Sequence, residues 1–193
     1  MTTAADLVAA ALRAVPRQGF LPPAQRGYAR RDAPLPIGHE QTNSQPTTVR
    51  QMLELLDTRA GQSVLDVGSG SGWTTALLAH LVGPQGRVVG VERVPELVAF
   101  GAGNVEAAGM PWASVERARP GTLGLPEGAP YDRVLVSAQA SDLPGELVDQ
   151  LGDDGILVIP VAGRMLQVHR PASGAAPVVE EHGWYRFVPL VTD

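Results

Sequence analysis

Three glycines at alternate positions, preceded by an acidic residue, form the stretch whose residue types and spacing most clearly indicate chemistry. Gly68, Gly70 and Gly72 follow Asp66 where a short apolar run meets a helical pattern. Glycines let a ligand approach the backbone, and the free N–H groups of a helix start favour an anionic or polar group. Glu92 comes twenty residues after Gly72, the distance expected of an acidic residue that accepts hydrogen bonds from ribose hydroxyls. These residues predict a nucleoside site.

Two other phosphate-binding motifs fit the glycines less well. A dinucleotide fingerprint would have its third glycine at the position of Trp73, whereas the third glycine here is Gly72, which disfavours a pyrophosphate ligand. A P-loop is excluded because it needs a lysine, and all fifteen basic residues are arginine. The remaining alternative is a tight strand-to-helix turn without a ligand, which would explain neither Asp66 nor the position of Glu92.

A second group of polar side chains lies in a proline-rich segment, residues 16–46, which contains six prolines. We expect this segment to be mostly irregular, and a loop this long is usually either functional or disordered. Its second half mixes apolar residues with small hydrogen-bonding residues at 41–45, which a disordered linker would not need. The alternative is that Ser44 or Thr42 only caps the following helix, with Pro46 near its first turn.

Composition narrows the chemistry further. Without cysteine or lysine, the chain has no disulfide, thiolate metal site, cysteine nucleophile or Schiff-base lysine. Its histidines are dispersed, so we expect no metal site; only His39 lies near the polar loop. The net charge of −5 disfavours a nucleic-acid partner, and without a basic leader or a run of eighteen apolar residues we expect a cytoplasmic protein with no membrane partner.

The elements that must position these residues alternate between strands and helices, which predicts a parallel sheet with helices on both faces. The predicted strands are 63–67, 87–91, 112–116, 131–137, 155–161, 165–170 and 184–190. The predicted helices are 4–15, one that starts after Pro46, 74–82, 95–109 and 143–151. At 193 residues one domain is expected, with an N-terminal helix and substrate loop at 1–46 and an α/β core at 47–193.

The combination of Asp66, the three glycines and Glu92 resembles the motif of Rossmann-like S-adenosylmethionine-dependent methyltransferases. A narrower set of residues resembles the protein-L-isoaspartate O-methyltransferase family, in order along nearly the whole chain. These residues are Arg17, Phe20, Tyr28, Pro34–Gly38, Gln41–Pro46, Leu65–Trp73 and Arg186–Val191. The resemblance implies an α/β Rossmann-like class I methyltransferase fold, with a central, mostly parallel seven-stranded sheet and helices on both faces.

By this resemblance the cofactor is S-adenosyl-L-methionine and the partner is a protein or peptide with an isoaspartyl carboxylate. The residues assigned to the cofactor are Asp66, Gly68, Ser69, Gly70, Gly72, Glu92, Arg93, Arg119 and Pro120. Those assigned to the substrate are His39, Thr42, Asn43 and Ser44, with Ser44 as the catalytic residue. The implied activity is carboxyl O-methylation of L-isoaspartyl residues, a protein-repair reaction, by a monomeric enzyme.

The implied reaction requires positioning more than proton transfer. A carboxyl group with a pKa of about 4 is already ionised at neutral pH and can attack the sulfonium methyl without a base. A serine hydroxyl such as that of Ser44 can donate a hydrogen bond to the carboxylate and fix its direction.

Two further functions remain open alternatives. The chain could methylate a carboxylate in another peptide or small molecule, or it could be a binding module without catalysis. One departure from the family also bears on donor affinity: Arg119-Pro120-Gly121 stands where the family usually has Gly-Asp-Gly. Because proline lacks both a carboxylate and an N–H, we expect one hydrogen bond to the adenine to be missing.

Overall fold

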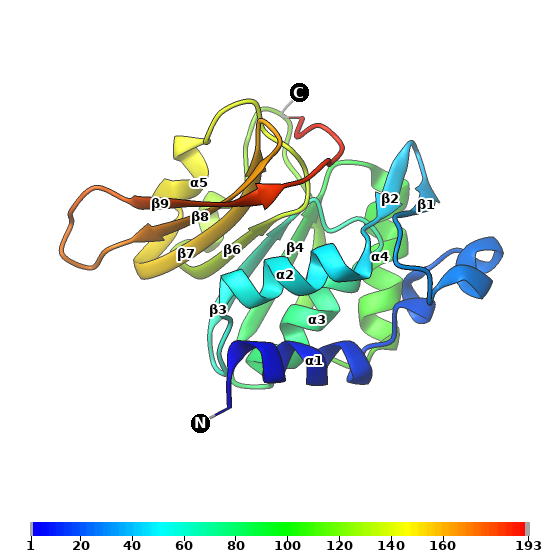
Figure 1. The fold of residues 1–193 in the computed structure, drawn as a ribbon. Coiled ribbons are helices and arrows are strands. Elements are labelled where there is room, and N and C mark those ends of the chain that lie inside the picture. Colours follow the sequence, from blue (N-terminus) through cyan, green and yellow to red (C-terminus); the bar gives the residue numbers. More distant parts are fainter. Residues whose placement is uncertain (1, 192–193) are drawn as a thin grey trace.

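A seven-stranded sheet forms the centre of the protein, whose computed structural model describes residues 2–191 (Figure 1). Its strands are β3 (Ser63–Val67), β4 (Arg87–Glu92), β5 (Ala113–Arg117), β6 (Tyr131–Val136), β7 (Leu151–Val161), β8 (Arg164–Arg170) and β9 (Val178–Trp184). They are ordered β5-β4-β3-β6-β7-β8-β9. The first five are parallel, while β8 and β9 are antiparallel to their neighbours. The mostly parallel α/β fold implied by the resemblance is therefore confirmed.

Helices cover both faces of this sheet. They are α1 (Ala4–Ala14), α2 (Pro46–Leu56), α3 (Trp73–Val82), α4 (Pro95–Ala107) and α5 (Gly145–Asp149). Side chains of α1, α2 and α3 share one buried cluster with Val64 and Leu135 of the sheet. On the other face, Leu147 of α5 packs with Leu65 and Val134. Two apolar cores thus hold the parallel strands in place from both sides.

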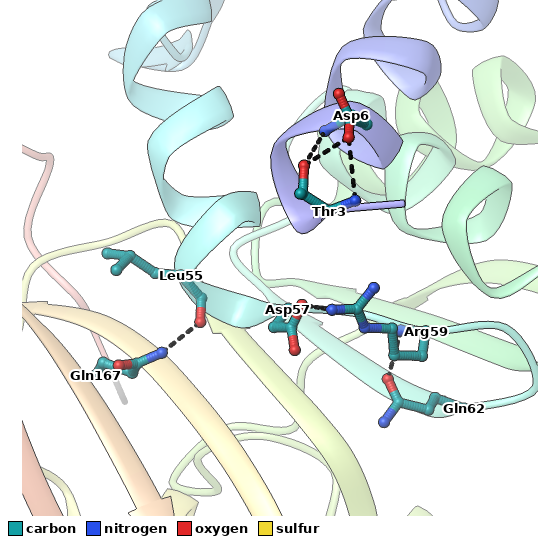
Figure 2. A network of polar contacts seen from close by, with 7 residues as sticks. All are labelled: Thr3, Asp6, Leu55, Asp57, Arg59, Gln62 and Gln167. Carbon is teal, nitrogen blue, oxygen red and sulfur yellow. Dashed lines mark hydrogen bonds and ion pairs between the residues drawn. The ribbon is translucent and has the colours of Figure 1, made fainter. Parts of the chain in front are cut away.

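Polar contacts fix the N-terminal helix and the end of α2 (Figure 2). Thr3 and Asp6 form a capping box at the start of α1: the Asp6 N–H donates to Thr3 Oγ1 at 3.2 Å, and the Thr3 N–H donates to Asp6 Oδ2 at 3.0 Å. Gln167 of β8 donates to the Leu55 carbonyl near the end of α2.

The division of one domain into residues 1–46 and 47–193 stays a prediction.

The proline-rich segment contains more regular structure than its composition suggests. It forms two 3₁₀ turns, η1 (Arg17–Phe20) and η2 (Pro23–Tyr28), and an antiparallel hairpin of β1 (Leu35–Gly38) and β2 (Gln41–Asn43). The hairpin turn has positive φ at three successive residues, 95° at Gly38, 53° at His39 and 59° at Glu40. Two of these are not glycine, so residue types alone gave no signal for this turn.

The strand expected at 184–190 is wrong. The sheet ends instead with β9, whose His182 pairs with Met165 of the neighbouring strand β8. Nearly every residue of β9 is exposed, so the strand lacks the alternation of apolar and polar residues that would reveal it. The chain after Trp184 turns back across the sheet, where Pro189 forms a bridge with Gln139.

Candidate cofactor and substrate pocket

A pocket opens at the carboxyl ends of the central parallel strands, where ligands bind in folds of this kind. Its walls come from the β1–β2 hairpin, the glycine loop, the ends of β4, β5 and β6, and the C-terminal segment. The lining residues are Ile37, 41–44, 67–71, Trp73, Thr74, 91–93, Ala118, 122–124, Ser137, Ala138 and 188–191. In Figure 1 the hairpin and the red C-terminal segment lie at the same end of the sheet.

The glycine loop supplies backbone to the pocket at two of its three glycines. Gly68 and Gly70 line the pocket with φ of 77° and 52°, and the N–H groups of Gly68 and Ser69 donate to the Val91 carbonyl at 2.9 and 3.1 Å. Gly72 lies outside the lining. A Cβ at Gly72 would be 2.8 Å from the Gly101 carbonyl oxygen, so this glycine permits close packing of α4 against the start of α3.

Glu92 is held in a fixed orientation at the end of β4. Its Oε2 accepts from the Gly70 N–H at 3.0 Å and its Oε1 accepts from the Val94 N–H at 2.9 Å. The residue is only 6% exposed and lines the pocket together with Arg93. Because each carboxylate oxygen has a second lone pair, Glu92 can still accept hydrogen bonds from a ligand hydroxyl.

Asp66 lies beneath the pocket and does not line it. Its side chain is fully buried, and Oδ2 accepts from the hydroxyls of Thr74 and Thr75, both at 2.7 Å. Burial raises the pKa of Asp66 to about 6, against the smaller lowering effect of the two threonine hydrogen bonds, and the charge of Glu92 adds to the rise. Asp66 therefore acts on the site indirectly, by fixing the first turn of α3.

The polar loop predicted to bind substrate forms one wall of the same pocket. Thr42, Asn43 and Ser44 all line it. Asn43 is buried, and its amide donates to Ser71 Oγ at 2.9 Å. This loop and the glycine loop are therefore joined by a direct hydrogen bond.

Ser44 does not cap the following helix. The N-cap of α2 is Gln45, which makes no capping hydrogen bond with its side chain. Asp32 takes this role instead, because its Oδ1 accepts from the Thr47 N–H at 2.9 Å. Within residues 2–191 no hydrogen bond engages the hydroxyl of Ser44 or Thr42, so both are available to a ligand.

Besides Asp66 and Gly72, three residues assigned to the site lie outside the pocket lining. His39 is exposed at the hairpin turn. Arg119 forms an ion pair with Glu127, and the exposed Pro120 lies in a turn that the Thr122 N–H closes on the Arg119 carbonyl at 3.1 Å. The neighbouring residues 118 and 122–124 face the pocket instead.

Other lining residues were not singled out as candidate site residues from the sequence. Ile37, Ser71, Ser137 and Ala138 are of this kind. The C-terminal wall, residues 188–191, was marked only by the family resemblance of residues 186–191. It is fixed by Gln139, whose N–H donates to the Val188 carbonyl at 2.7 Å and whose carbonyl accepts from the Leu190 N–H at 2.8 Å.

The described part of the chain offers neither a candidate metal site nor a membrane-spanning helix. Residues 2–191 contain no cluster of three or more histidine, cysteine, aspartate or glutamate side chains suited to a metal ion. None of the helices in the same range has the length and apolarity needed to cross a membrane.

Comparisons with known proteins agree on one family. The model of the protein-L-isoaspartate(D-aspartate) O-methyltransferase family matches residues 2–193. A protein-L-isoaspartate O-methyltransferase of Aeropyrum pernix is 49% identical over 158 residues, 82% of this chain and 61% of that protein. The protein of the same name from Methanopyrus kandleri is 45% identical over 188 residues, 95% of this chain and 83% of the relative. The chain thus spans less than two thirds of the first relative and most of the second.

A solved structure extends the agreement to the cofactor. A Plasmodium falciparum protein in complex with S-adenosyl-L-homocysteine superposes with a TM-score of 0.83 at 25% identity, covering 97% of this chain and 91% of that chain. The pocket fits a ligand of this kind, because Glu92 presents anchored acceptors and the buried Ser69 hydroxyl has no partner within the described residues. This chain belongs to the protein-L-isoaspartate(D-aspartate) O-methyltransferase family, whose cofactor is S-adenosyl-L-methionine.

Proposed function

We propose that this protein transfers the methyl group of S-adenosyl-L-methionine to the carboxylate of L-isoaspartyl residues in proteins or peptides, as a protein-repair enzyme. One observation carries the proposal: the polar loop with Thr42 and Ser44 lines the same pocket as Glu92 and the glycine loop. A substrate carboxylate at the loop and a donor at the glycines would therefore meet in one enclosed space. The names of the relatives support isoaspartate as the substrate.

At the donor end, Glu92 accepts hydrogen bonds from the ribose hydroxyls, and the backbone of Gly68, Ser69 and Gly70 lies against the donor. Arg93 extends this wall. Asp66 and Gly72 contribute from behind, because one fixes the start of α3 and the other allows α4 to approach it. Bound S-adenosyl-L-methionine would supply an electrophilic methyl group, which no side chain of the protein can provide.

At the substrate end, the chain has only to orient a nucleophile that is already charged. The isoaspartyl carboxylate is ionised at neutral pH, since its reference pKa is about 4. One carboxylate oxygen would attack the donor methyl carbon as the carbon–sulfur bond breaks, and the electron pair of that bond would remain on sulfur. Ser44 donates a hydrogen bond to the carboxylate, and Thr42 and Asn43 shape the pocket around it. No proton is transferred, which agrees with a site that has neither cysteine nor lysine.

A panel of carboxylates tests this proposal. The purified protein is incubated with methyl-labelled donor and with peptides that differ only in carrying isoaspartate, aspartate or glutamate. Label on the isoaspartyl peptide alone is the expected result. Equal labelling of all peptides would favour a broader carboxyl methyltransferase, and donor binding without label on any of them would favour another substrate. Absence of donor binding would favour a module without catalysis.

The assembly and location of the protein are also proposals. We infer a monomer in the cytoplasm that acts without a membrane or nucleic-acid partner. The net charge of −5 supports the last point, because phosphate backbones are bound by basic surfaces. Light scattering during gel filtration measures the mass directly, and a mass near twice 20.3 kDa would contradict the monomer.

A further inference from the structure

Arg17 is a buried cation that the proposed chemistry leaves unused. It lies in η1, only 5% exposed, and its guanidinium stands 5.5 Å from the ring centroid of Trp73. Burial lowers the pKa of Arg17 to about 10, so the side chain remains charged at neutral pH. Burial of a charged side chain costs free energy unless its N–H donors are hydrogen-bonded. The hydrogen-bond partners of Arg17 therefore indicate what its burial contributes.

The guanidinium of Arg17 is satisfied by five acceptors. Nη1 donates to the Arg31 carbonyl at 3.1 Å, and Nη2 donates to the Ala33 carbonyl at 3.0 Å. The other three bonds end on the substrate loop: Nε to Asn43 Oδ1 at 2.6 Å, and Nη2 to the carbonyls of Asn43 at 2.8 Å and Ser44 at 2.9 Å. Most of its hydrogen bonds therefore fix Asn43 and Ser44, two of the residues that line the pocket at its substrate end.

A second hydrogen bond of Asn43 connects the same residues to the glycine loop. The Asn43 side chain accepts from Arg17 through its oxygen and donates to Ser71 Oγ through its nitrogen, at 2.9 Å. The Ser71 carbonyl in turn accepts from Asn104 of α4 at 2.9 Å. We call Arg17, Asn43 and Ser71 the clamp; it connects the N-terminal segment, the substrate loop and the glycine loop.

We propose that Arg17 is a positioning residue for methyl transfer. Through the clamp it holds the Ser44 backbone, so that the Ser44 hydroxyl keeps its position relative to the glycine loop. The proposal rests on the proposed function for the role of Ser44. It extends that function to a side chain outside the pocket lining, which acts only through Asn43 and Ser44. A displacement of about 1 Å in a reacting group can lower turnover on the order of a hundredfold, so such a restraint has a measurable effect.

Arg17→Lys separates geometry from charge. Lysine keeps the positive charge but has a single nitrogen with three donors, whereas the planar guanidinium reaches five acceptors from three nitrogens. The variant must therefore release part of the loop. Arg26→Lys is the matched control, because Arg26 lies in the same N-terminal segment and donates through Nε to the Leu21 carbonyl at 3.1 Å, away from the substrate loop.

Three experiments are made on wild type and both variants: steady-state kinetics with the isoaspartyl peptide, which gives kcat and KM, calorimetry, which gives the donor Kd, and hydrogen exchange with S-adenosyl-L-homocysteine bound. For Arg17→Lys we expect kcat to fall tenfold or more, on the order of the cost of a misplaced group. Donor Kd should change far less, and exchange should accelerate in residues 41–47 while β3 and β4 keep their protection. Arg26→Lys should match wild type in all three.

Other results would overturn the proposal. Unchanged kcat and unchanged exchange at 41–47 would show that the loop does not depend on Arg17. A uniform rise in exchange with a lowered melting temperature would show that Arg17 only stabilises the fold. If Arg17→Lys does not fold, Ser71→Ala breaks the clamp at its other end and should also accelerate exchange at 41–47; protection equal to wild type would again refute the clamp. If wild type does not methylate the isoaspartyl peptide, the proposed function fails, and the exchange comparison still decides whether Arg17 holds the loop.

Discussion

Replacement of Glu92 by glutamine should weaken donor binding while the fold is retained. Both carboxylate oxygens of Glu92 accept from backbone N–H groups, those of Gly70 and Val94. Glutamine offers one oxygen and one NH₂ group, so one of these two N–H groups would face another donor. The charge that attracts the ribose hydroxyls is also lost.

The size of this effect follows from the bonds that are removed. A hydrogen bond to a charged group contributes about 1.5–3 kcal/mol, and 1.4 kcal/mol is a tenfold change in Kd. Loss of one such bond to the ribose should therefore raise the donor Kd by about 10- to 150-fold. Gly70 lies in the glycine loop and Val94 follows the end of β4. Loss of either bond therefore affects the site and leaves the hydrogen bonds of the sheet intact.

Calorimetric titration with S-adenosyl-L-methionine and with S-adenosyl-L-homocysteine measures this directly. Glu96→Gln is the matched control, because Glu96 is an exposed residue in the first turn of α4 and should bind both ligands like wild type. A Kd for Glu92→Gln within twofold of wild type would refute the reasoning, because Glu92 would then not contact the donor.

Three further predictions follow from the same contacts. Ser44→Ala should lower kcat more than it raises donor Kd and should leave the melting temperature unchanged, since Ser44 caps no helix; normal kinetics would remove Ser44 from the mechanism. The pKa of Asp66 is raised from 3.8 to about 6 in the folded protein, so the folded state binds this proton more tightly than the unfolded state does. The contribution of Asp66 to the free energy of unfolding therefore rises as pH falls from 6 towards 3.8, and it is lost as pH rises through 6. Melting curves of Asp66→Asn should lack this increment, and identical pH profiles would contradict it. Pro120→Asp should leave donor affinity unchanged in calorimetry, because Pro120 is exposed and lies outside the pocket lining; a gain of one hydrogen bond, about 1 kcal/mol or fivefold, would show that position 120 reaches the adenine.

The sequence predicted the elements whose apolar spacing is regular. The buried positions of α2, namely Val49, Met52, Leu53 and Leu56, repeat at helical spacing, which is why the sequence predicts a helix after Pro46. The strands β3 and β4 were also predicted within a residue, because both are buried apolar runs bounded by turn residues. A helix or strand that is buried on one face or on both faces shows a regular pattern of apolar residues in the sequence.

Elements set by long-range contacts or unusual backbone could not be predicted in this way. The β1–β2 turn needs positive φ at His39 and Glu40, which neither residue type requires. The cap of α2 comes from Asp32, fifteen residues before its partner Thr47. The strand β9 is paired along one edge and largely exposed, so no apolar period marks it.

The candidate site likewise combines features that the sequence predicted with features that it did not. The sequence predicted one nucleoside site from the glycines and Glu92, and in the structure the Gly70 N–H donates a hydrogen bond to the Glu92 carboxylate. That both bind a donor stays a prediction. The direction of Asp66 was not predicted, although strand alternation places it with Val64 on the face that α3 covers. The reason for Gly72 was also hidden, because its close neighbour Gly101 belongs to the next helix along the chain.

The ratio of kcat/KM for two peptides that differ only in one isoaspartyl or aspartyl residue tests the central claim most directly. We expect methyl transfer to the isoaspartyl peptide and none measurable to the matching aspartyl peptide, with the ester on the isoaspartyl carboxylate. Equal kcat/KM for the two peptides, or methylation of neither by a protein that binds S-adenosyl-L-methionine, would contradict it.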